Sequence, residues 1–285
     1  MSSGNSIIVG IVLYNPDLRR LQLNVDAIKN DVESILLIDN DSKNISEIQI
    51  FVNKYGINLI QNKKNEGLPR TFNTMIQTAR DNNFDNLLLL DQDSVCAKNL
   101  IYLYKKNIVN DYVCITPRIV HRLKEYEQKY GIKSKLEKEL IVESINSGTL
   151  INLNMLPPDI RFNEHLFIDC VDFDFFLQIS KKNLKVLRIN SATLFCDLGN
   201  LKVHYLFHKP FFSNNYSIFR LEKQAKDRVI FIFSHFKEPL ARKVFFLSIL
   251  GYFTLILFEQ QKVLKLRAIF KGLWKGVCTL LSVAR

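Results

Sequence analysis

Two aspartates one residue apart follow directly on an apolar run. Residues 87–93 read LLLLDQD, which places Asp91 and Asp93 at the end of a segment typical of a buried strand. Carboxylates at this spacing point the same way from extended backbone and repel each other unless a cation lies at the site. Mg²⁺ and Mn²⁺ prefer oxygen ligands and often bind one or two carboxylates together with substrate phosphates. We therefore predict a site for Mg²⁺ or Mn²⁺ at this pair.

The elements before this pair indicate how it is positioned. Apolar runs at 7–13, 34–40 and 57–60 alternate with segments of helical spacing, one opened by Pro16 and Asp17 and one over 68–80. Continuous apolar strands that alternate with helices are typical of a parallel sheet covered on both faces. Ligands of such sheets lie beyond the carboxyl ends of the strands. The polar residues expected at that edge are Tyr14, Asn15, Asp39, Asn40, Asp91, Gln92 and Asp93.

A glycine-containing loop precedes the helix expected over 68–80. In NKKNEGLPRTFN, Gly67 permits a tight turn, and the free N–H groups of the following helix suit a phosphate or ribose oxygen. Lys63, Lys64 and Arg70 add positive charge. An ordinary loop at the start of a helix would look the same, so both interpretations stay open.

A second acidic cluster stands in FIDCVDFDFFLQ. Asp169, Asp172 and Asp174 precede an aromatic segment of helical spacing. Acids in a first helical turn stabilise the helix by about 0.3–1 kcal/mol each, which is sufficient reason for their presence. The alternative is catalytic, because a transferase needs a carboxylate to accept a proton from the attacking hydroxyl.

Taken together, the motifs resemble one enzyme family. The order of these motifs along the chain resembles that of family 2 glycosyltransferases of the GT-A fold: VGIVLYNP, LLIDNDS, NEGLPRTFN, LLLLDQDS, SGTLI and VDFDF. The Asp-Gln-Asp-Ser form is similar to the bacterial rhamnosyltransferase branch. The resemblance spans roughly residues 7–220. It implies an α/β, Rossmann-like fold with a mostly parallel central sheet flanked by helices.

The resemblance also implies roles for individual residues. Asp172 is the expected general base, with Asp174 in support, and Asp39 contacts the nucleotide base. A second motif, HKPFFSNNYSIFR, resembles a family element that implies Arg220 as a phosphate ligand. In the same motif, His208 either completes the metal site or contacts the diphosphate. The implied donor-binding set is Tyr14, Asn15, Asp39, Asn40, Asn65, Gly67, Arg70, Asn73, Asp91, Gln92, Ser147, Gly148 and Arg220; the implied metal ligands are Asp91, Asp93 and His208.

Three positions depart from the pattern of the family. Cys196 stands where the branch usually has a histidine, and Ser217 and Leu221 replace a tyrosine and an asparagine. These changes bear on the identity of the sugar more than on the type of reaction.

The last fifth of the chain differs from the rest. Residues 236–285 carry nine Lys and Arg against two acids, a balance of 9 − 2 = +7 within a total of +11. Residues 244–258 are uncharged, and their length falls short of the roughly 20 residues that span a bilayer. Beyond them, apolar residues from Val263 to Val277 share one helical face, with Lys265, Lys271 and Lys275 on the other side. We expect a helical tail that lies on an anionic membrane surface, although a pair of core helices fits the pattern as well.

These observations predict the domains and the compartment. We expect a catalytic domain over 1–235, with a nucleotide-sugar half of about 1–117 and an acceptor half of about 118–235, followed by the tail over 236–285. The charged stretch 122–140 should be an exposed loop or helix. Five scattered cysteines and the lack of a basic N-terminal segment favour a cytoplasmic protein on the inner face of the cell membrane.

The leading functional hypothesis is an inverting, metal-dependent glycosyltransferase. It would move L-rhamnose from dTDP-rhamnose to a lipid-linked saccharide in bacterial O-antigen or capsule synthesis. A UDP-hexose or UDP-N-acetylhexosamine donor, or a non-catalytic scaffold of a polysaccharide assembly complex, are the alternatives. Nucleic acid is not an expected partner, because the basic residues alternate with an apolar face and no nucleic-acid motif is present.

Overall fold

The computed structural model describes residues 5–197, 199, 201–206 and 209–283. The chain forms two compact units. Unit 1 comprises residues 1–162 and 175–197, and unit 2 comprises residues 163–174 and 198–285. The boundary expected at residue 235 lies within unit 2, and the division into domains stays a prediction.

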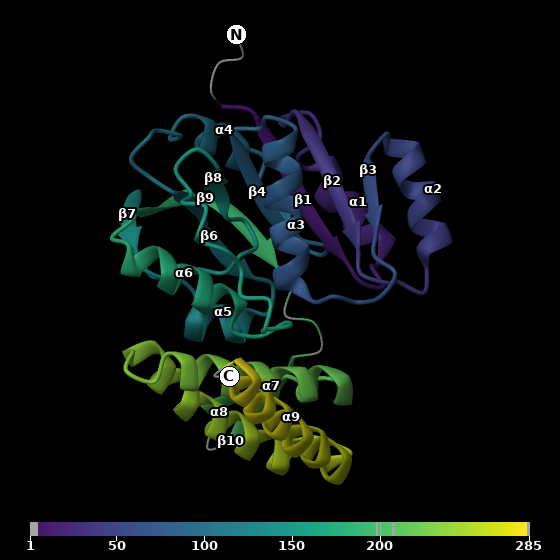
Figure 1. Cartoon of the computed structure of the whole chain (residues 1–285), viewed down its shortest axis with the longest axis vertical. Helices are drawn as coiled ribbons and strands as arrows, with labels where there is room; N and C mark the ends of the chain where they lie inside the picture. The colour runs from purple at the N-terminus through teal and green to yellow at the C-terminus, as the bar shows by residue number, and fades with distance from the viewer. Residues whose placement is uncertain (1–4, 198, 200, 207–208, 284–285) are drawn as a thin grey trace. The chain divides into compact units, whose positions relative to one another are not determined.

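Unit 1 is built on a mixed β-sheet. The strands follow the order β3-β2-β1-β4-β8-β6-β9-β5, and β7 pairs with β9. The strands β3, β2, β1 and β4 are parallel and lie side by side in Figure 1, whereas β8 is antiparallel to both β4 and β6. The strand bounds are β1 Ile7–Leu13, β2 Ser34–Asp39, β3 Asn58–Gln61, β4 Asn86–Asp91, β5 Val95–Cys96, β6 Cys114–His121, β7 Lys138–Ile141, β8 Leu150–Asn152 and β9 Val186–Cys196.

Helices cover both faces of this sheet. Alternate residues of β1 point to opposite faces, so each set of side chains packs against a different layer of helices. Ile7, Val9 and Ile11 belong to the core shared with α1 (Leu18–Asp26), α2 (Ile45–Tyr55) and α4 (Leu100–Lys105). On the other face, α3 (Leu68–Asp81) packs on β1 and β4. A Cβ atom at Gly10 would lie 2.5 Å from the sulfur of Met75, so the small residue permits this close approach.

The first hundred residues agree with most of the predicted elements. The strands at 7–13 and 34–39, the helix begun by Asp17 and the helix at 68–81 are all present. Asp17 caps α1 by accepting a hydrogen bond from the backbone N–H of Arg19. The helix α2 was not predicted from the sequence. The charged stretch 122–140 contains the short helix α5 (Lys124–Tyr130) and the start of β7, a strand that was also missed.

Unit 2 is mainly helical. It contains the hairpin of β10 (Lys202–Leu206) and β11 (Lys209–Ser213), followed by α7 (Ile218–Ser234), α8 (Pro239–Phe258) and α9 (Lys262–Val283). The helix α7 packs against both α8 and α9, as Figure 1 shows. Gly272 and Gly276 let α9 approach α7 closely, since a Cβ atom at Gly272 would lie 2.2 Å from the backbone oxygen of Glu222.

The tail is helical as predicted, but its faces differ from the expected ones. Lys265 was assigned to a solvated polar side, whereas its side chain is buried and bonded to Glu259, with Nζ 2.6 Å from Oε2. Ile269 packs in the core with Leu221, while Phe270 and Trp274 stay exposed. The apolar stripe of α9 is therefore divided between the contact with α7 and the surface. Small residues, Ala268, Gly272 and Gly276, form much of the buried face.

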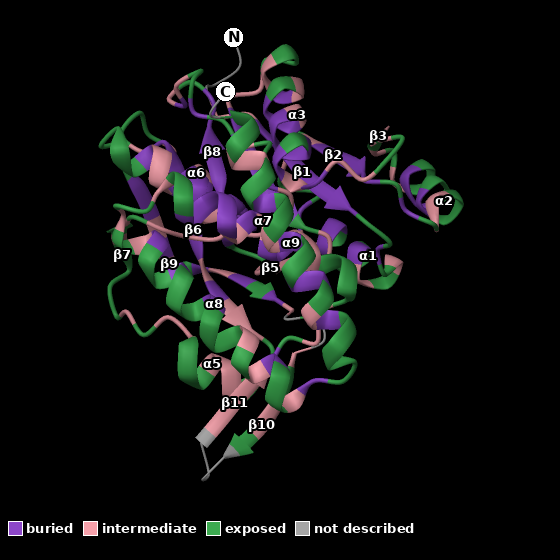
Figure 2. Ribbon diagram, turned by 60° about the horizontal axis from the view of Figure 1, so that its bottom comes forward, coloured by how far each residue is buried: buried purple, intermediate pink, exposed green. Residues whose placement is uncertain are grey.

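The helix α8 exposes most of its apolar side chains. Its buried residues are Ala241, Val244, Ser248 and Leu255, a stripe that packs within unit 2. Among the described residues, α8 is the one helix long and apolar enough to cross a membrane. Figure 2 shows α8 largely in the colour of exposed residues. The large apolar residues of α8 that are exposed are Phe245, Phe246, Leu247, Ile249, Leu250, Phe253, Ile256 and Leu257.

Candidate active site

The carboxyl ends of β1, β2 and β4 meet at one edge of unit 1, because the three strands are parallel neighbours. Hydrogen bonds join the loop after β1 to the loops after β4 and β2. The N–H of Tyr14 donates to Oε1 of Gln92 at 2.9 Å, and Nε2 of Gln92 donates to the carbonyl of Tyr14 at 3.3 Å. The N–H of Asn15 donates to Oγ of Ser42 at 2.7 Å. The predicted residues Tyr14, Asn15 and Gln92 therefore lie together.

Asp39 is fully buried at the end of β2. Its Oδ2 accepts a hydrogen bond from the N–H of Ser42 at 3.1 Å, while its Oδ1 has no hydrogen-bond partner in the described structure. A buried acceptor without a partner carries a desolvation cost of about 1–3 kcal/mol, so a ligand N–H that reached it would be favoured. Such an orphaned oxygen fits the expected contact of Asp39 with a nucleotide base.

Asn40 joins the end of β2 to the glycine loop. Its Oδ1 accepts hydrogen bonds from Nδ2 of Asn62 at 2.8 Å and from Oγ1 of Thr71 at 3.2 Å, and its Nδ2 lies 3.5 Å from the carbonyl of Gly67. Gly67 has φ +83°, a conformation that favours glycine, and its N–H donates to Oδ1 of Asn65. The loop is thus fixed at the start of α3.

Arg70 and Asn73 both lie on α3, in different environments. Arg70 is exposed and pairs with Glu66 at 3.3 Å. Asn73 is buried and exchanges two hydrogen bonds with the backbone of Phe162, at 2.9 Å and 3.0 Å. The side chain of Asn73 therefore fixes the segment around Phe162, and a contact of Asn73 with a donor stays a prediction.

Asp91, the last residue of β4, lies beside Ser147, and Asp93 follows two residues later. The N–H of Asp91 donates to Oγ of Ser147 at 2.9 Å, and this hydroxyl also bonds the hydroxyl of Ser94 at 2.9 Å. Gly148 has φ +82°, and a Cβ atom there would lie 2.6 Å from Pro117. Asp91 is exposed and Asp93 partly buried. Two carboxylates at a strand end fit the ligand chemistry of a hard divalent cation that keeps water or phosphate oxygens as its other ligands.

No complete metal site is formed by protein groups alone in the described part of the chain. Within it, no three His, Cys, Asp or Glu side chains lie close enough together to hold an ion. His208, the third ligand expected from the sequence, lies outside the described residues.

Cys196 is buried near the aspartate pair at the end of β9. Its sulfur lies 3.5 Å from Oγ of Ser94. Burial raises the pKa of the Cys196 thiol to about 12, with further contributions from Asp91, Asp93 and Asp197. Where the resemblance places a histidine, this chain thus has a thiol that stays protonated near neutral pH.

Asn24 is not among the site residues predicted from the sequence. It is fully buried on α1, and its Nδ2 donates to the carbonyl of Asp91 at 2.8 Å. A polar residue between the apolar positions Leu21 and Val25 was the available signal. This bond anchors the backbone at the start of the Asp-Gln-Asp motif.

Asp172 and Arg220 belong to unit 2. Asp172 is partly buried in the first turn of α6 (Val171–Lys181), and its Oδ1 accepts from the N–H of Phe173 at 2.9 Å. Asp174 is buried, and its Oδ1 lies 2.9 Å from Nε2 of His235. Arg220 is exposed, with its guanidinium 4.2 Å from the ring of Tyr216. The roles assigned to Asp172 and Arg220 stay predictions.

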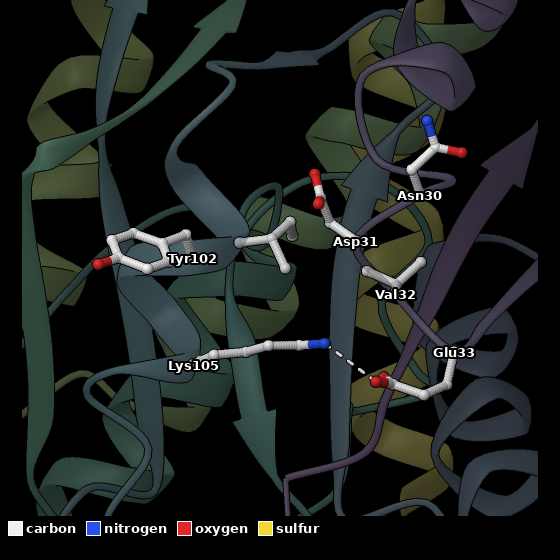
Figure 3. A pocket seen from close by; sticks show the side chains of 7 residues that line it. Asn30, Asp31, Val32, Glu33, Tyr102 and Lys105 are labelled. Atoms are coloured by element: carbon white, nitrogen blue, oxygen red, sulfur yellow. Dashed lines mark hydrogen bonds and ion pairs between the residues drawn. The ribbon is translucent and has the colours of Figure 1, made fainter.

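Unit 1 also has a pocket away from the carboxyl ends of the strands. It has a volume of about 280 Å³ and lies at the amino end of β2, opposite to the edge described above. Figure 3 shows Lys105 of α4 pointing to Glu33 across it, with Nζ 2.9 Å from Oε1. Because this ion pair already joins its walls, we assign it no part in the site.

Comparison with known proteins decides the family. The model of the glycosyl transferase family 2 matches residues 8–165, which is more than half of the chain. The chain belongs to glycosyl transferase family 2. The family predicted from the motifs is thus confirmed, and so is the assignment of the chain to the glycosyltransferases.

One curated bacterial protein is similar to the chain over most of its length. The chain is 25% identical over 212 residues to the dTDP-rhamnosyl transferase RfbF of Shigella flexneri, which covers 70% of this chain and 71% of that protein. This similarity agrees with the rhamnosyltransferase-like branch.

Solved structures confirm the fold. The structure of GalNAc-T7 with UDP, GalNAc and Mn²⁺ matches with a TM-score of 0.54 and 16% identity over 71% of this chain. The structure of S. aureus TarS 1-349 with UDP-GlcNAc matches with a TM-score of 0.52 and 14% identity over 79% of this chain. The chain spans 44% and 66% of these two proteins. The expected α/β fold of the GT-A type is therefore confirmed.

Proposed function

We propose that the chain is an inverting, metal-dependent glycosyltransferase that moves L-rhamnose from dTDP-rhamnose to a lipid-linked saccharide in the synthesis of a bacterial surface polysaccharide. The observation that carries the proposal is the convergence of Asp39, Asp91 and Asp93 on one edge of the sheet of unit 1. The similarity to a dTDP-rhamnosyl transferase supports rhamnose as the sugar.

In this proposal the edge of unit 1 binds the donor. The orphaned oxygen of Asp39 accepts a hydrogen bond from the nucleotide base. N–H groups at the start of α3, together with Arg70, favour the phosphates. Asp91 and Asp93 would hold Mg²⁺ or Mn²⁺, and the bound ion would supply positive charge next to the nucleoside diphosphate.

Asp172 is the general base of the proposed reaction. Its carboxylate takes the proton of the acceptor hydroxyl while the hydroxyl oxygen forms a bond to the anomeric carbon. The bond from that carbon to the diphosphate oxygen breaks on the opposite face, so the configuration of the sugar inverts. Asp172 is suited to this role because it is only partly buried.

A panel of donors tests this proposal. The whole chain is incubated with Mn²⁺, a bacterial lipid extract and dTDP-rhamnose, UDP-glucose, UDP-galactose or UDP-GlcNAc, and release of the nucleotide is measured. We expect release with dTDP-rhamnose, loss of release with EDTA, and loss of turnover but not of donor affinity in Asp172→Asn. The variant Asp159→Asn, at an exposed ion pair of unit 1, is the control. No turnover with any donor would contradict the proposal.

A UDP-sugar donor is the second candidate. The specific observation that favours it is the similarity in fold to proteins solved with UDP and UDP-GlcNAc. Thermal unfolding with the same donors distinguishes them, since at equal concentration the donor that binds more tightly raises the melting temperature more.

We also propose that unit 2 binds the cytoplasmic face of the cell membrane. The exposed apolar residues of α8, together with Phe270 and Trp274 of α9, form a surface that water does not favour. The basic balance of residues 236–285 suits anionic headgroups. A lipid-linked acceptor would be available at that surface.

A further inference from the structure

One carboxylate of α7 binds three consecutive backbone N–H groups. Asp227 is fully buried, and its Oδ2 accepts hydrogen bonds from Phe167, Ile168 and Asp169 at 3.0 Å, 2.8 Å and 3.0 Å. Its Oδ1 has no hydrogen-bond partner in the described structure and lies 3.6 Å from Nζ of Lys226. Charge-assisted bonds of this kind are roughly twice as strong as neutral ones. The segment 167–169 is thus fixed to α7.

The same segment has a second attachment to α7. Nε of Arg228 donates to Oδ2 of Asp169 at 2.6 Å, and Nη1 of Arg228 donates to Oγ of Ser248 on α8 at 3.2 Å. On the other side of Asp172, the carboxylate of Asp174 is bonded to His235. Asp172 therefore stands between two anchored positions.

The backbone between these positions is strained. Cys170 has φ +59°, a left-handed conformation that non-glycine residues rarely adopt and that costs of order 1–3 kcal/mol. Such a conformation persists only where surrounding contacts impose it. Asp227 and Arg228 are those contacts, since they bind the three residues immediately before Cys170.

We propose that Asp227 is a positioning residue for Asp172. Its carboxylate holds residues 167–169 so that Cys170 keeps its left-handed turn and Asp172 enters the first turn of α6 in the orientation that catalysis needs. This inference rests on the proposed function, in which Asp172 is the general base. Asp227 itself is buried and touches no substrate.

An anchor with a merely structural role would behave differently. Its loss would lower the stability of the fold, but molecules that remained folded would turn over at the normal rate. A positioning residue changes kcat in folded protein, and it leaves the affinity for the nucleotide unchanged because the donor-binding residues at the strand ends belong to unit 1.

The experiment compares four variants with the whole wild-type chain. Asp227→Asn keeps an oxygen acceptor but loses the charge, and Asp227→Ala loses both. Asp227→Asn/Cys170→Gly relieves the strained turn, because glycine adopts positive φ without cost. Glu222→Gln is the matched control, since Glu222 lies on the same helix and pairs with Lys271 and Lys275 of α9 instead of the segment 167–169.

We expect kcat with the donor identified by the panel to fall about tenfold in Asp227→Asn and further in Asp227→Ala, with KM for the donor and the affinity for dTDP within about twofold. The added Cys170→Gly should restore a large part of the lost kcat. Hydrogen exchange at residues 167–169 should become faster in the two single variants Asp227→Asn and Asp227→Ala and stay unchanged in Glu222→Gln.

Two results would overturn the inference. One is an Asp227→Asn or Asp227→Ala protein that is folded and keeps the wild-type kcat. The other is a lowered kcat that Cys170→Gly does not raise. A wild-type chain without turnover would overturn the proposed function instead, so the two failures are distinguishable.

Discussion

Arg228 and Asp169 form an ion pair that joins α7 to the segment before α6. The distance from Nε of Arg228 to Oδ2 of Asp169 is 2.6 Å, and about a fifth to a quarter of each side chain remains exposed, 21% and 25% respectively. Burial alone would lower the pKa of Arg228, but the neighbouring carboxylate outweighs it and the pKa is raised. Arg228 therefore keeps its positive charge beside Asp169.

Replacing this arginine should destabilise the fold. Arg228→Met leaves the Asp169 carboxylate without its cation, and removal of one partner of a fully buried pair costs about 3–5 kcal/mol. The partial exposure of both side chains reduces this figure, so we expect a loss of about 2 kcal/mol in the free energy of unfolding. Urea unfolding measures it. Lys182→Met, at the exposed pair with Asp159, should change stability by less than about 1 kcal/mol.

The contact of α9 with α7 should tolerate no added side chain at Gly272. A Cβ atom there meets the backbone of Glu222, which cannot move aside as a side chain can. We expect Gly272→Ala to lower the free energy of unfolding by about 1–3 kcal/mol. Gly251→Ala on α8 is the control, since nothing lies within 4 Å of a Cβ atom at that position. There the better helix former should raise stability by up to about 1 kcal/mol. Equal effects at the two glycines would contradict the packing argument.

Asp227 should give the stability of the chain an unusual pH dependence. Burial raises the pKa of Asp227 to about 6 from its ordinary 3.8, although three backbone N–H groups and Lys226 act in the opposite direction. The folded chain thus binds the proton more tightly than the unfolded chain. The contribution of this group to the free energy of unfolding is largest below the ordinary pKa and is lost as the pH rises to about 6.

The difference between wild type and Asp227→Asn isolates this contribution from the other carboxylates. Urea unfolding at several pH values between 3.8 and 7 should show wild type losing stability relative to the variant up to about pH 6, and a constant difference above it. A difference that does not change with pH would show that the carboxyl titrates normally.

The nucleotide site should depend on the buried oxygen of Asp39. Asp39→Ala removes the unpartnered acceptor, so we expect the affinity for the nucleotide to fall about tenfold or more. Isothermal titration of dTDP and UDP into the chain measures this. Asp26→Ala, at an exposed ion pair of α1, should bind as wild type does. Unchanged affinity in Asp39→Ala would remove Asp39 from the donor site.

Membrane binding should depend on the exposed face of α8. Phe246→Asp/Phe253→Asp places two charges on that face, where the wild-type side chains are 67% and 63% exposed. Flotation with vesicles that contain anionic lipid should show at least a tenfold loss of bound protein, since a charge in the bilayer interface is costly. Ile50→Asp on α2 is the control, because Ile50 is exposed to a similar extent, 71%, outside the tail. Wild type that does not float with such vesicles would contradict the proposal.

The sequence alone was sufficient for the strands β1, β2 and β4 and for the helix α3. Each is a contiguous run with a clear period, and the polar residues that follow it in the chain lie at the same strand end in the fold. The motifs around Asp39, Gly67 and Asp91 were therefore recognisable, because their function depends on neighbours in the chain.

Contacts between distant segments were decided by the tertiary structure. Lys265 has the side chain of a solvated residue, yet it is buried with Glu259. Asn73 fits a donor-binding motif, yet its amide bonds the backbone of Phe162, 89 residues away. Asp227 looks like one more charge on a helix, whereas folding brings it to residues about 60 positions earlier. A local pattern specifies periodicity and capping, but the burial of a charge depends on which groups from elsewhere in the chain surround it.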